Sequence, residues 1–506
     1  MRPADLVTLG ALWLAQLLIL YPYFEVAPIY DGAWNYHDLM QASCSRFRCA
    51  DLVLSGHTSL YYVALLLAVL KLDPASIKLV VLTNWVLLAA ASLAFLSAAY
   101  HLVGHERTVE VRLATLVFGL SPWMLAHVLH LNWDFGVAIH FVILLSALLG
   151  NRPWLAAAAG LAMGLCKENG LALYLVTLLA DGLRGGQHHR GRWWPHLLAL
   201  LVWGALVWVA FGVQRAPVSY HLALAGMGRP QGFLSRIFAF NLLDWTLLTY
   251  LADIFVLNFH WLLSLPVLIS LRFSVGSSRV LFLRVLMVGV VYLVTRFLVF
   301  NNVRYLMTAL PVLLLLSCQA TCRLWPKGRL GSGYWLLVLV VVTASNFRTL
   351  DPLSRALYGT FEFGQHRCLR MGRLGGSSAI GRDELVYNLE FLQLAILQDL
   401  ALRKVRAQPG TLIYVEPDSD FWTPGWLDGK SRRTGRRGPR PQVFPFRYLT
   451  DPALATVARG PLCYLEFPNQ VGHRVRADLL RRYGPAAVEN IDHQGYRLRL
   501  YRFTGG

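Results

Sequence analysis

Two aspartates stand where a membrane protein rarely keeps carboxylates. Asp31 follows the first long apolar run, in the segment Tyr30-Asp-Gly-Ala-Trp-Asn-Tyr-His-Asp38, and Asp134 stands alone between two later runs, in His130-Leu-Asn-Trp-Asp-Phe. Ionisable side chains at such places are costly and usually have a function. A carboxylate can accept a proton from a hydroxyl group, so two acids on one side of a membrane predict proton-transfer chemistry there.

The composition indicates a membrane protein. Of the 506 residues, 56% are hydrophobic and 15% are charged, and the mean hydropathy is +0.47. Apolar runs of about 20 residues recur along the chain, and this is the length that a helix needs to cross a bilayer. No small-residue cleavage site follows the first run, Leu6 to Tyr23, so we expect a retained helix with a cytoplasmic N-terminus.

The basic residues orient the predicted bundle. The net charge of +19 alone is compatible with nucleic-acid binding, but the cations are clustered in alternate loops. These loops contain Arg107 and Arg112; Arg184, Arg190 and Arg192; Arg272 and Arg279; and Arg323, Lys327 and Arg329. Because the short loops between them carry one cation or none, the pattern follows the positive-inside rule. We therefore expect a multi-pass protein of the cytoplasmic membrane, in contact with membrane lipids and without a nucleic-acid partner.

The apolar runs predict about eleven transmembrane helices. They lie near residues 6–24, 76–100, 111–130, 134–150, 154–167, 169–183, 194–213, 247–271, 279–299, 304–321 and 333–345. The apolar stretch from Gly56 to Leu70 is too short for another span and would invert the later loops. We therefore predict a helix lying in the interface, within an external loop at 25–75. An odd number of spans places the C-terminus outside, on the same side as Asp31 and Asp134.

A change of composition near Asn346 predicts a second domain. We divide the chain into a transmembrane bundle, 1–345, and an extracytoplasmic mixed α/β domain, 346–506. Short alternating segments that begin at Thr411, Leu462 and Tyr496 predict strands, and Glu384 to Arg406 predicts an amphipathic helix. The basic segment 429–440 has no large apolar residue, which is typical of a solvated loop.

The cysteines and the common cofactor motifs indicate little. Cys44 and Cys49 lie in the first external loop, where an oxidising compartment can join them. The sequence has no cysteine or histidine pair with zinc-site spacing, no glycine-rich phosphate loop and no internal repeat.

Five features follow one another along the bundle. They are Asp31 after the first span, Gly56-His57-Thr-Ser-Leu-Tyr-Tyr62 at the end of the external loop, Asp134 at the start of a later span, the turn Gly164-Leu-Cys-Lys167-Glu168-Asn-Gly-Leu, and Arg304-Tyr305-Leu306 before Pro311. In this order they resemble the GT-C membrane glycosyltransferases that use polyprenyl-phosphate sugars, such as the protein O-mannosyltransferases and the lipid A aminoarabinose transferase. The resemblance covers roughly residues 1–345. It rests on the order of the motifs and on their predicted position on the same side of the membrane.

The resemblance implies a GT-C fold and a glycosyltransferase. Such an enzyme moves a sugar from a polyprenyl-phosphate carrier to a hydroxyl of a protein, lipid or polysaccharide at the extracytoplasmic face. Asp31 would act as general base, and Asp134 would orient the acceptor or share a cation. The donor phosphate would be bound by Lys167, Arg304 and His57, and the auxiliary candidates are Asp38, Tyr305 and Glu168.

The sequence departs from the family pattern at two places. The Asp-Glu pair of many members is Asp31-Gly32 here, and the two prolines that follow the histidine are Thr58 and Ser59. Because the glutamate is absent, the sequence does not require a divalent metal and leaves metal binding open.

Simpler roles are open for the same side chains. Asp31 and Asp38 can stabilise a helix N-terminus through the helix dipole. Lys167 and Glu168 can form an interfacial ion pair, and Arg304 can be a snorkelling anchor. The competing class of protein is a transporter or flippase without chemistry, which places its acids near the middle of the bilayer and often has repeated halves. The acids of this chain stand at the ends of spans, so the sequence favours an enzyme.

Overall fold

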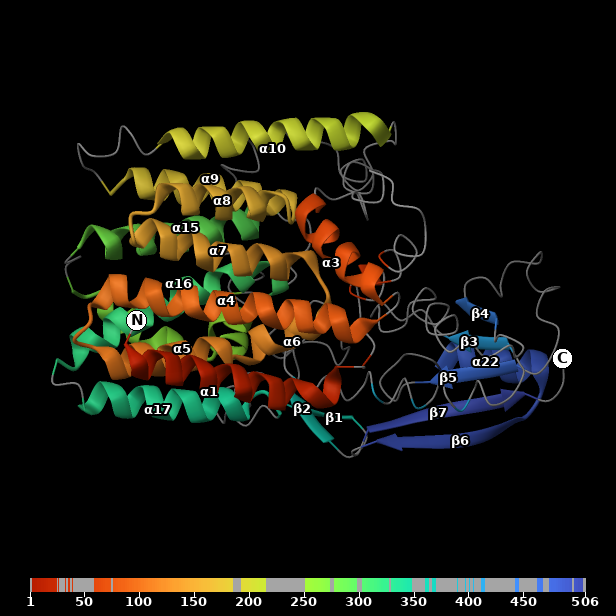
Figure 1. Ribbon diagram of the computed structural model, residues 1–506. Helices are drawn as coiled ribbons and strands as arrows, with labels where there is room; N and C mark the ends of the chain where they lie inside the picture. Colours follow the sequence, from red (N-terminus) through yellow and green to blue (C-terminus); the bar gives the residue numbers. More distant parts are fainter. Residues whose placement is uncertain are drawn as a thin grey trace.

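The computed structural model describes most of the helical bundle and the strands that follow it. The described residues are 2–24, 26, 32, 35–36, 39, 59–73, 76–184, 193–214, 251–273, 277–297, 303–326, 329–347, 360–363, 366–369, 389, 396, 400, 404, 411–414, 442–445, 462–466, 473–493 and 496–503. Figure 1 shows long helices running side by side, with a small sheet beyond one end of the bundle.

The first part of the chain is helical. Its helices are α1 (Pro3–Leu20), η1 (Tyr21–Tyr23), α3 (Leu60–Leu72), α4 (Ile77–Val103), α5 (Thr108–Gly119), α6 (Pro122–His130), α7 (Trp133–Leu149), α8 (Pro153–Gly164), α9 (Glu168–Gly182), α10 (Trp193–Gln214), η5 (Asp253–Asn258), α14 (Trp261–Ser270), α15 (Ser278–Phe297), η6 (Val303–Thr308), α16 (Ala309–Leu324) and α17 (Arg329–Ala344). Within the described residues, five helical segments are long and apolar enough to cross a membrane, namely Pro3–Tyr23, Ile77–Val103, Thr108–His130, Trp193–Ala210 and Leu306–Leu324. Shorter apolar helices, among them α7 and α8, lie between these.

Two of the predicted spans contain a break. The predicted span 111–130 consists of α5 and α6, because Pro122 begins α6 and lacks the N–H that would continue the helical ladder. In the described part of the predicted span 247–271, η5 and α14 are separated at Phe259 and His260, and His260 has a φ of +72°. Hydropathy does not reveal such breaks, since the residues on both sides are apolar.

Helix α3 differs in direction from the long helices. It overlaps the segment from Gly56 to Leu70, for which an interfacial helix was predicted, and ends two residues later, and Figure 1 shows it inclined across the end of the bundle near the sheet. The backbone N–H of Tyr61 donates to the carbonyl of Leu165, 3.1 Å away, in the turn between α8 and α9. The start of α3 is therefore held against that turn.

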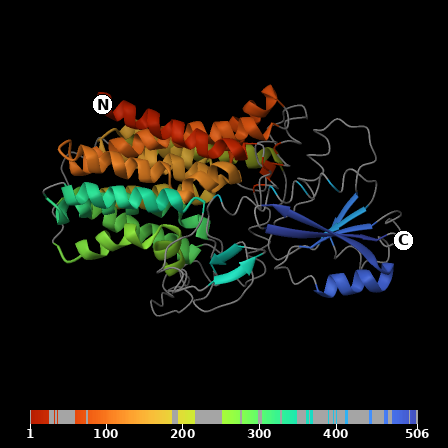
Figure 2. The ribbon, with the colours of Figure 1, turned by 90° about the horizontal axis from the view of Figure 1, so that it is seen from below.

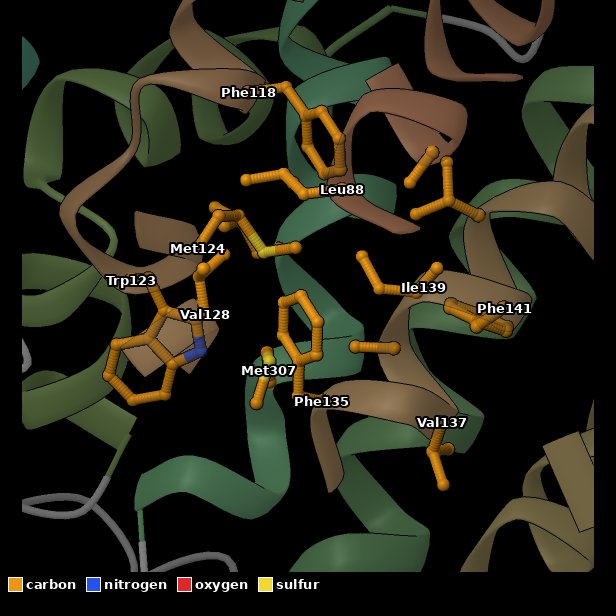
Figure 3. Packing of buried hydrophobic residues seen from close by; sticks show 14 of the residues in the cluster. Leu88, Phe118, Trp123, Met124, Val128, Phe135, Val137, Ile139, Phe141 and Met307 are labelled. Carbon is orange, nitrogen blue, oxygen red and sulfur yellow. The ribbon is translucent and has the colours of Figure 1, made fainter. Parts of the chain in front are cut away.

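Helix α7 is the centre of the bundle. Every residue from Trp133 to Val142 is buried, and the helix packs against α4, α8, α9 and η6. A helix that is apolar on all sides is expected where neighbours surround it. Figure 3 shows Phe135, Ile139 and Phe141 of α7 in the same cluster as Leu88 of α4 and Met307 of η6. The rigid position of α7 fixes the polar residues at its first turn.

Three arginines of the predicted cytoplasmic loops, Arg107, Arg112 and Arg279, lie at the end of the bundle where the chain begins. Arg112 of α5 donates through Nε to Asp5 Oδ1 of α1 at 2.7 Å, and Tyr100 of α4 donates to the same oxygen at 2.7 Å. Arg107 donates to the carbonyl of Pro326, and Arg279 donates to that of His101. These bonds join helices α1, α4, α5 and α15 and the loop before α17 at one surface, away from the sheet.

The strands form two sheets. Strands β1 (Thr360–Phe363) and β2 (His366–Leu369) make an antiparallel hairpin. The larger sheet has the order β4-β3-β5-β7-β6, from β3 (Thr411–Tyr414), β4 (Gln442–Pro445), β5 (Leu462–Glu466), β6 (Ala486–His493) and β7 (Tyr496–Phe503). In this sheet β3 is parallel to β4 and β5, whereas β7 is antiparallel to β5 and β6. The strands predicted to begin at Thr411, Leu462 and Tyr496 are β3, β5 and β7.

The two faces of the larger sheet are covered differently. Helix α22 (His473–Tyr483) packs Leu479 against Tyr464 and Tyr501 on one face, and Figure 2 shows this helix beside the strands. The opposite face contributes residues such as Leu465 and Leu500 to the same apolar cluster as the bundle. In the helix predicted at 384–406, the structure describes only single positions.

Candidate active site

The first turn of α7 places Asp134 at the end of the bundle near the sheet. Leu131, with a left-handed φ of +46°, ends α6 and turns the chain. Asn132 then caps α7, because its Oδ1 accepts a hydrogen bond from the N–H of Phe135 at 3.0 Å. Asp134 is the second residue of the helix, where the positive end of the helix dipole stabilises a carboxylate.

Lys167 meets Asp134 from the turn between α8 and α9. Its Nζ lies 3.0 Å from Asp134 Oδ1 and 3.1 Å from Oδ2, so one ammonium group contacts both carboxylate oxygens. Both residues are almost fully buried, Lys167 at 6% exposure and Asp134 at 4%. Buried charges are stabilised only where they are paired and hydrogen bonded, so this ion pair ties the start of α9 to the start of α7.

Asn169 completes the cluster from the first turn of α9. Its side-chain Nδ2 donates to Asp134 Oδ1 at 3.0 Å. Lys167, immediately before α9, and Asn169, in its first turn, therefore both donate to the same carboxylate. We name Asp134, Lys167 and Asn169 the acid–amine–amide cluster.

Three helices begin around this cluster. Helices α7 and α9 begin at Trp133 and Glu168, and α3 begins at Leu60 beside the α8–α9 turn. The ring of Tyr62, in α3, packs edge-on against that of Trp133 with centroids 5.5 Å apart. A helix N-terminus carries a positive partial charge, so three of them at one place favour an anionic ligand.

A polar contact holds α3 in place beside α7. The hydroxyl of Tyr62 donates to Asn84 of α4, and the Asn84 amide donates to the carbonyl of Val128 in α6 at 3.0 Å. These side chains are fully buried or nearly so. Because buried polar groups must be satisfied, this chain of hydrogen bonds fixes the relative positions of α3, α4 and α6 beneath the cluster.

The structure brings together some of the predicted site residues. Asp134 and Lys167 are in direct contact, and Glu168 is the first residue of α9. The structure pairs Lys167 with Asp134, an acid 33 residues away along the chain. The packing of α9 on α7 brings these two side chains together.

The other predicted site residues are described only in part. Asp31, Asp38 and His57 lie outside the described residues, as do Cys44 and Cys49. The backbone of Arg304 and Tyr305 lies in η6, which packs against α7, but their side chains are outside the described part. Among the described residues no group of three or more His, Cys, Asp or Glu side chains has a geometry that holds a metal ion.

Asn132 and Asn169 were not among the predicted site residues, yet both contribute to the site. Asn132 had a readable signal, since an asparagine immediately before an apolar helical run is a typical N-cap. Asn169 had none, because its role depends on the distance to Asp134 in another helix.

Comparison with solved structures shows which fold this arrangement belongs to. A crystal structure of ArnT from Cupriavidus metallidurans bound to undecaprenyl phosphate matches with a TM-score of 0.56 and 12% sequence identity, over 98% of this chain and 97% of that one. The chain has the ArnT fold. The apo crystal structure of ArnT from the same organism matches at a TM-score of 0.49 and 13% identity, over 97% of each chain. No protein-family model and no curated protein sequence matches the chain. The likeness to ArnT confirms the GT-C fold that the order of the motifs predicted.

Proposed function

We propose that the chain is an integral membrane glycosyltransferase that moves a sugar from a polyprenyl-phosphate carrier to an acceptor hydroxyl. The observation that carries the proposal is the acid–amine–amide cluster at the common start of three helices. The ArnT fold supports it, since one ArnT structure is bound to undecaprenyl phosphate. The helical bundle with its apolar segments supports a membrane-embedded protein.

The phosphate of the carrier is the ligand that suits the helix starts. Negative charge develops on this phosphate as the bond to the sugar breaks, and N–H groups and cations stabilise that charge. We assign the cationic contacts to Lys167 and Arg304, with His57 as a further donor. Helix η6, which contains Arg304, packs against α7, the helix whose first turn contains Asp134. A guanidinium group can bind two phosphate oxygens at once.

Asp31 is the proposed general base. It takes the proton from the acceptor hydroxyl while the acceptor oxygen bonds to the anomeric carbon of the sugar. The bond from that carbon to the phosphate oxygen breaks, and the carrier leaves as a polyprenyl phosphate with the electron pair on its oxygen. Asp134 suits a positioning role, since its carboxylate oxygens already accept from Lys167 and Asn169. Asp38, Tyr305 and Glu168 are auxiliary candidates.

The proposed orientation places the site outside the cytoplasm. Helices α7 and α9 begin, with the cluster, at the end of the bundle near the sheet, whereas Arg107 and Arg279 lie at the end where the chain begins (Figure 1). By the positive-inside rule the basic end faces the cytoplasm. The cluster and the domain at 346–506 are then extracytoplasmic, in a protein of the cytoplasmic membrane.

Binding and transfer assays on the purified chain test this function. We expect undecaprenyl phosphate to bind at micromolar concentrations in detergent or nanodiscs, and a radiolabelled sugar to move from its undecaprenyl-phosphate form to an acceptor fraction of lipid, protein or polysaccharide. A chain that translocates the lipid-linked sugar across vesicle membranes without any transfer would be a flippase, and the enzyme proposal would be wrong. If the chain does not bind undecaprenyl phosphate, it is neither the proposed glycosyltransferase nor a flippase for that carrier.

A further inference from the structure

The Asn169 side chain has a buried oxygen that the described structure leaves unused. Its Nδ2 donates to Asp134, whereas its Oδ1 is enclosed and accepts no hydrogen bond from the described residues. Enclosed polar atoms without a partner are rare in folded proteins, and each one calls for an explanation such as a ligand or a bound water.

The orientation of the Asn169 amide follows from its neighbour. The oxygen and nitrogen of an amide are assigned from their hydrogen bonds. A carboxylate oxygen of Asp134 lies 3.0 Å from the end of the amide, and only the NH₂ group can approach it without repulsion. The oxygen must therefore point away from Asp134, and it is available only to a hydrogen-bond donor.

Two further enclosed polar atoms belong to the other helices that begin here. Trp133 Nε1, beside Asp134 in α7, and Ser59 Oγ, at the residue that precedes α3, have no hydrogen-bond partner among the described residues. Ser59 adjoins Leu60 and Tyr61, whose helix start is bonded to the α8–α9 turn. Asn169 Oδ1 is an acceptor, Trp133 Nε1 is a donor and the Ser59 hydroxyl can do both, so each of the three helix starts contributes at least one such atom.

The chemistry of these atoms selects the kind of ligand. A phosphate dianion offers acceptors only, so it would be repelled by Asn169 Oδ1. An apolar lipid chain would leave all three atoms unsatisfied. A sugar hydroxyl both donates and accepts, and it can bond Asn169 Oδ1 while a neighbouring oxygen accepts from an N–H.

We infer that Asn169 is a specificity residue that binds a hydroxyl group of a substrate, either the donor sugar or the acceptor, with the phosphate bound elsewhere in the site. The inference rests on the proposed function and divides the site into a part that binds the phosphate and a part that binds the hydroxyl. The cations Lys167 and Arg304 bind the carrier phosphate, while Asn169 selects the substrate hydroxyl and at the same time positions Asp134. The hydroxyl belongs either to the sugar of the donor or to the acceptor, and the two sources give different results in the test.

The test compares ligands that differ only in the sugar. Wild-type chain, Asn169→Leu and Asn169→Ala are titrated with bare undecaprenyl phosphate and with a series of undecaprenyl-phosphoryl pentoses and hexoses. The control is Thr177→Val, two turns further along α9, where a buried hydroxyl bonds only the carbonyl of Leu173 within its own helix. An unchanged unfolding temperature and elution as a single species in size-exclusion chromatography show that each variant is folded. If Asn169→Leu is not folded, Asn169→Ala replaces it in the test.

The expected result is a loss of discrimination at unchanged carrier affinity. We expect wild-type and Thr177→Val chains to bind one sugar-bearing carrier more tightly than the bare carrier, and both Asn169 variants to lose about tenfold in affinity for that ligand only. If donor affinity is unchanged and the KM for the acceptor rises instead, the hydroxyl is that of the acceptor and the inference stands.

Other results would overturn the inference. An equal loss for bare and sugar-bearing carriers would mean that Asn169 only supports the fold of the site, and unchanged affinities with an unchanged acceptor KM would mean that its oxygen binds no substrate. If the wild-type chain does not bind undecaprenyl phosphate at all, the proposed function is wrong, and the inference, which rests on it, is wrong as well.

Discussion

Lys167 Nζ lies 3.0 Å from Asp134 Oδ1, and neither residue is more than 6% exposed. The pair joins the starts of two helices that the chain reaches 33 residues apart. Each of the two charges needs the other in order to stay buried, because burying a single unpaired charge costs far more free energy than burying the pair. The pair therefore contributes to the stability of the bundle as well as to the proposed chemistry.

Removing one member of the pair should destabilise the protein. We expect Lys167→Met or Asp134→Leu alone to lower the free energy of unfolding by about 3–5 kcal/mol, because each leaves an uncompensated buried charge. The double variant should recover most of that stability and still lack transfer activity. Unfolding in detergent, followed by heat or denaturant, measures the first effect, and a sugar-transfer assay measures the second. A double variant as unstable as either single variant would show that the pair is not the cause.

Asp31→Asn should abolish most of the transfer. The substitution keeps the size of the side chain and removes its charge and its basic oxygen, so we expect the rate to fall by about 10² or more. Asp38→Asn is the matched control, seven residues further along, and should have a smaller effect. The measurement is transfer from a lipid-linked sugar in membranes with equal amounts of each protein. Equal rates for Asp31→Asn and wild type would contradict the assignment of the base.

Arg304→Ala should weaken binding of the carrier without unfolding the chain. A charge-assisted contact to phosphate contributes about 1.5–3 kcal/mol, so the Kd for undecaprenyl phosphate should rise about tenfold or more. Arg272→Ala is a suitable control, because Arg272 stacks over Phe273 in a predicted cytoplasmic loop. Titration of purified protein with undecaprenyl phosphate gives both constants. An unchanged Kd for Arg304→Ala would make Arg304 a membrane anchor.

Reporter fusions should locate the domain at 346–506 outside the cytoplasm. A periplasm-active reporter fused near Gly410 is expected to be active, and fusions in the loops at 184–192 and 322–330 are expected to be inactive, because the positive-inside rule retains basic loops. The reverse pattern would invert the bundle and move the acid–amine–amide cluster to the cytoplasmic side.

Gly170→Ala should disturb the cluster through the backbone. A Cβ at this position would lie 2.2 Å from the carbonyl oxygen of Met163 and 3.2 Å from a Val137 methyl group. The end of α8 must then move away from the start of α9, and Lys167 moves with it, so we expect a loss of about 1–3 kcal/mol in stability together with lower transfer activity.

The matched control for this substitution is Gly204→Ala in α10. A Cβ there meets nothing within 4 Å, so the variant should be neutral or slightly stabilising, as alanine is the better helix former. If both glycine variants have the same stability and the same transfer activity, close packing at Gly170 does not position the cluster.

The helical bundle followed largely from the sequence. Runs of apolar residues such as 76–100 and 134–150 predict α4 and α7 because a membrane helix must satisfy its own backbone and present apolar side chains along its whole length. The breaks after α5 and η5 did not follow, because Pro122 and His260 interrupt helices inside stretches that remain apolar.

Sequence order and motif content also determined the candidates Asp134 and Lys167, since a charged residue at the end of an apolar run is visible without a structure. Their pairing, and the part of Asn169 in it, came only from the tertiary structure. The physical reason is distance along the chain. Local spacing places a residue on a helix and on a face of it, but the packing of α9 against α7 decides which side chain of a remote helix lies within 3 Å.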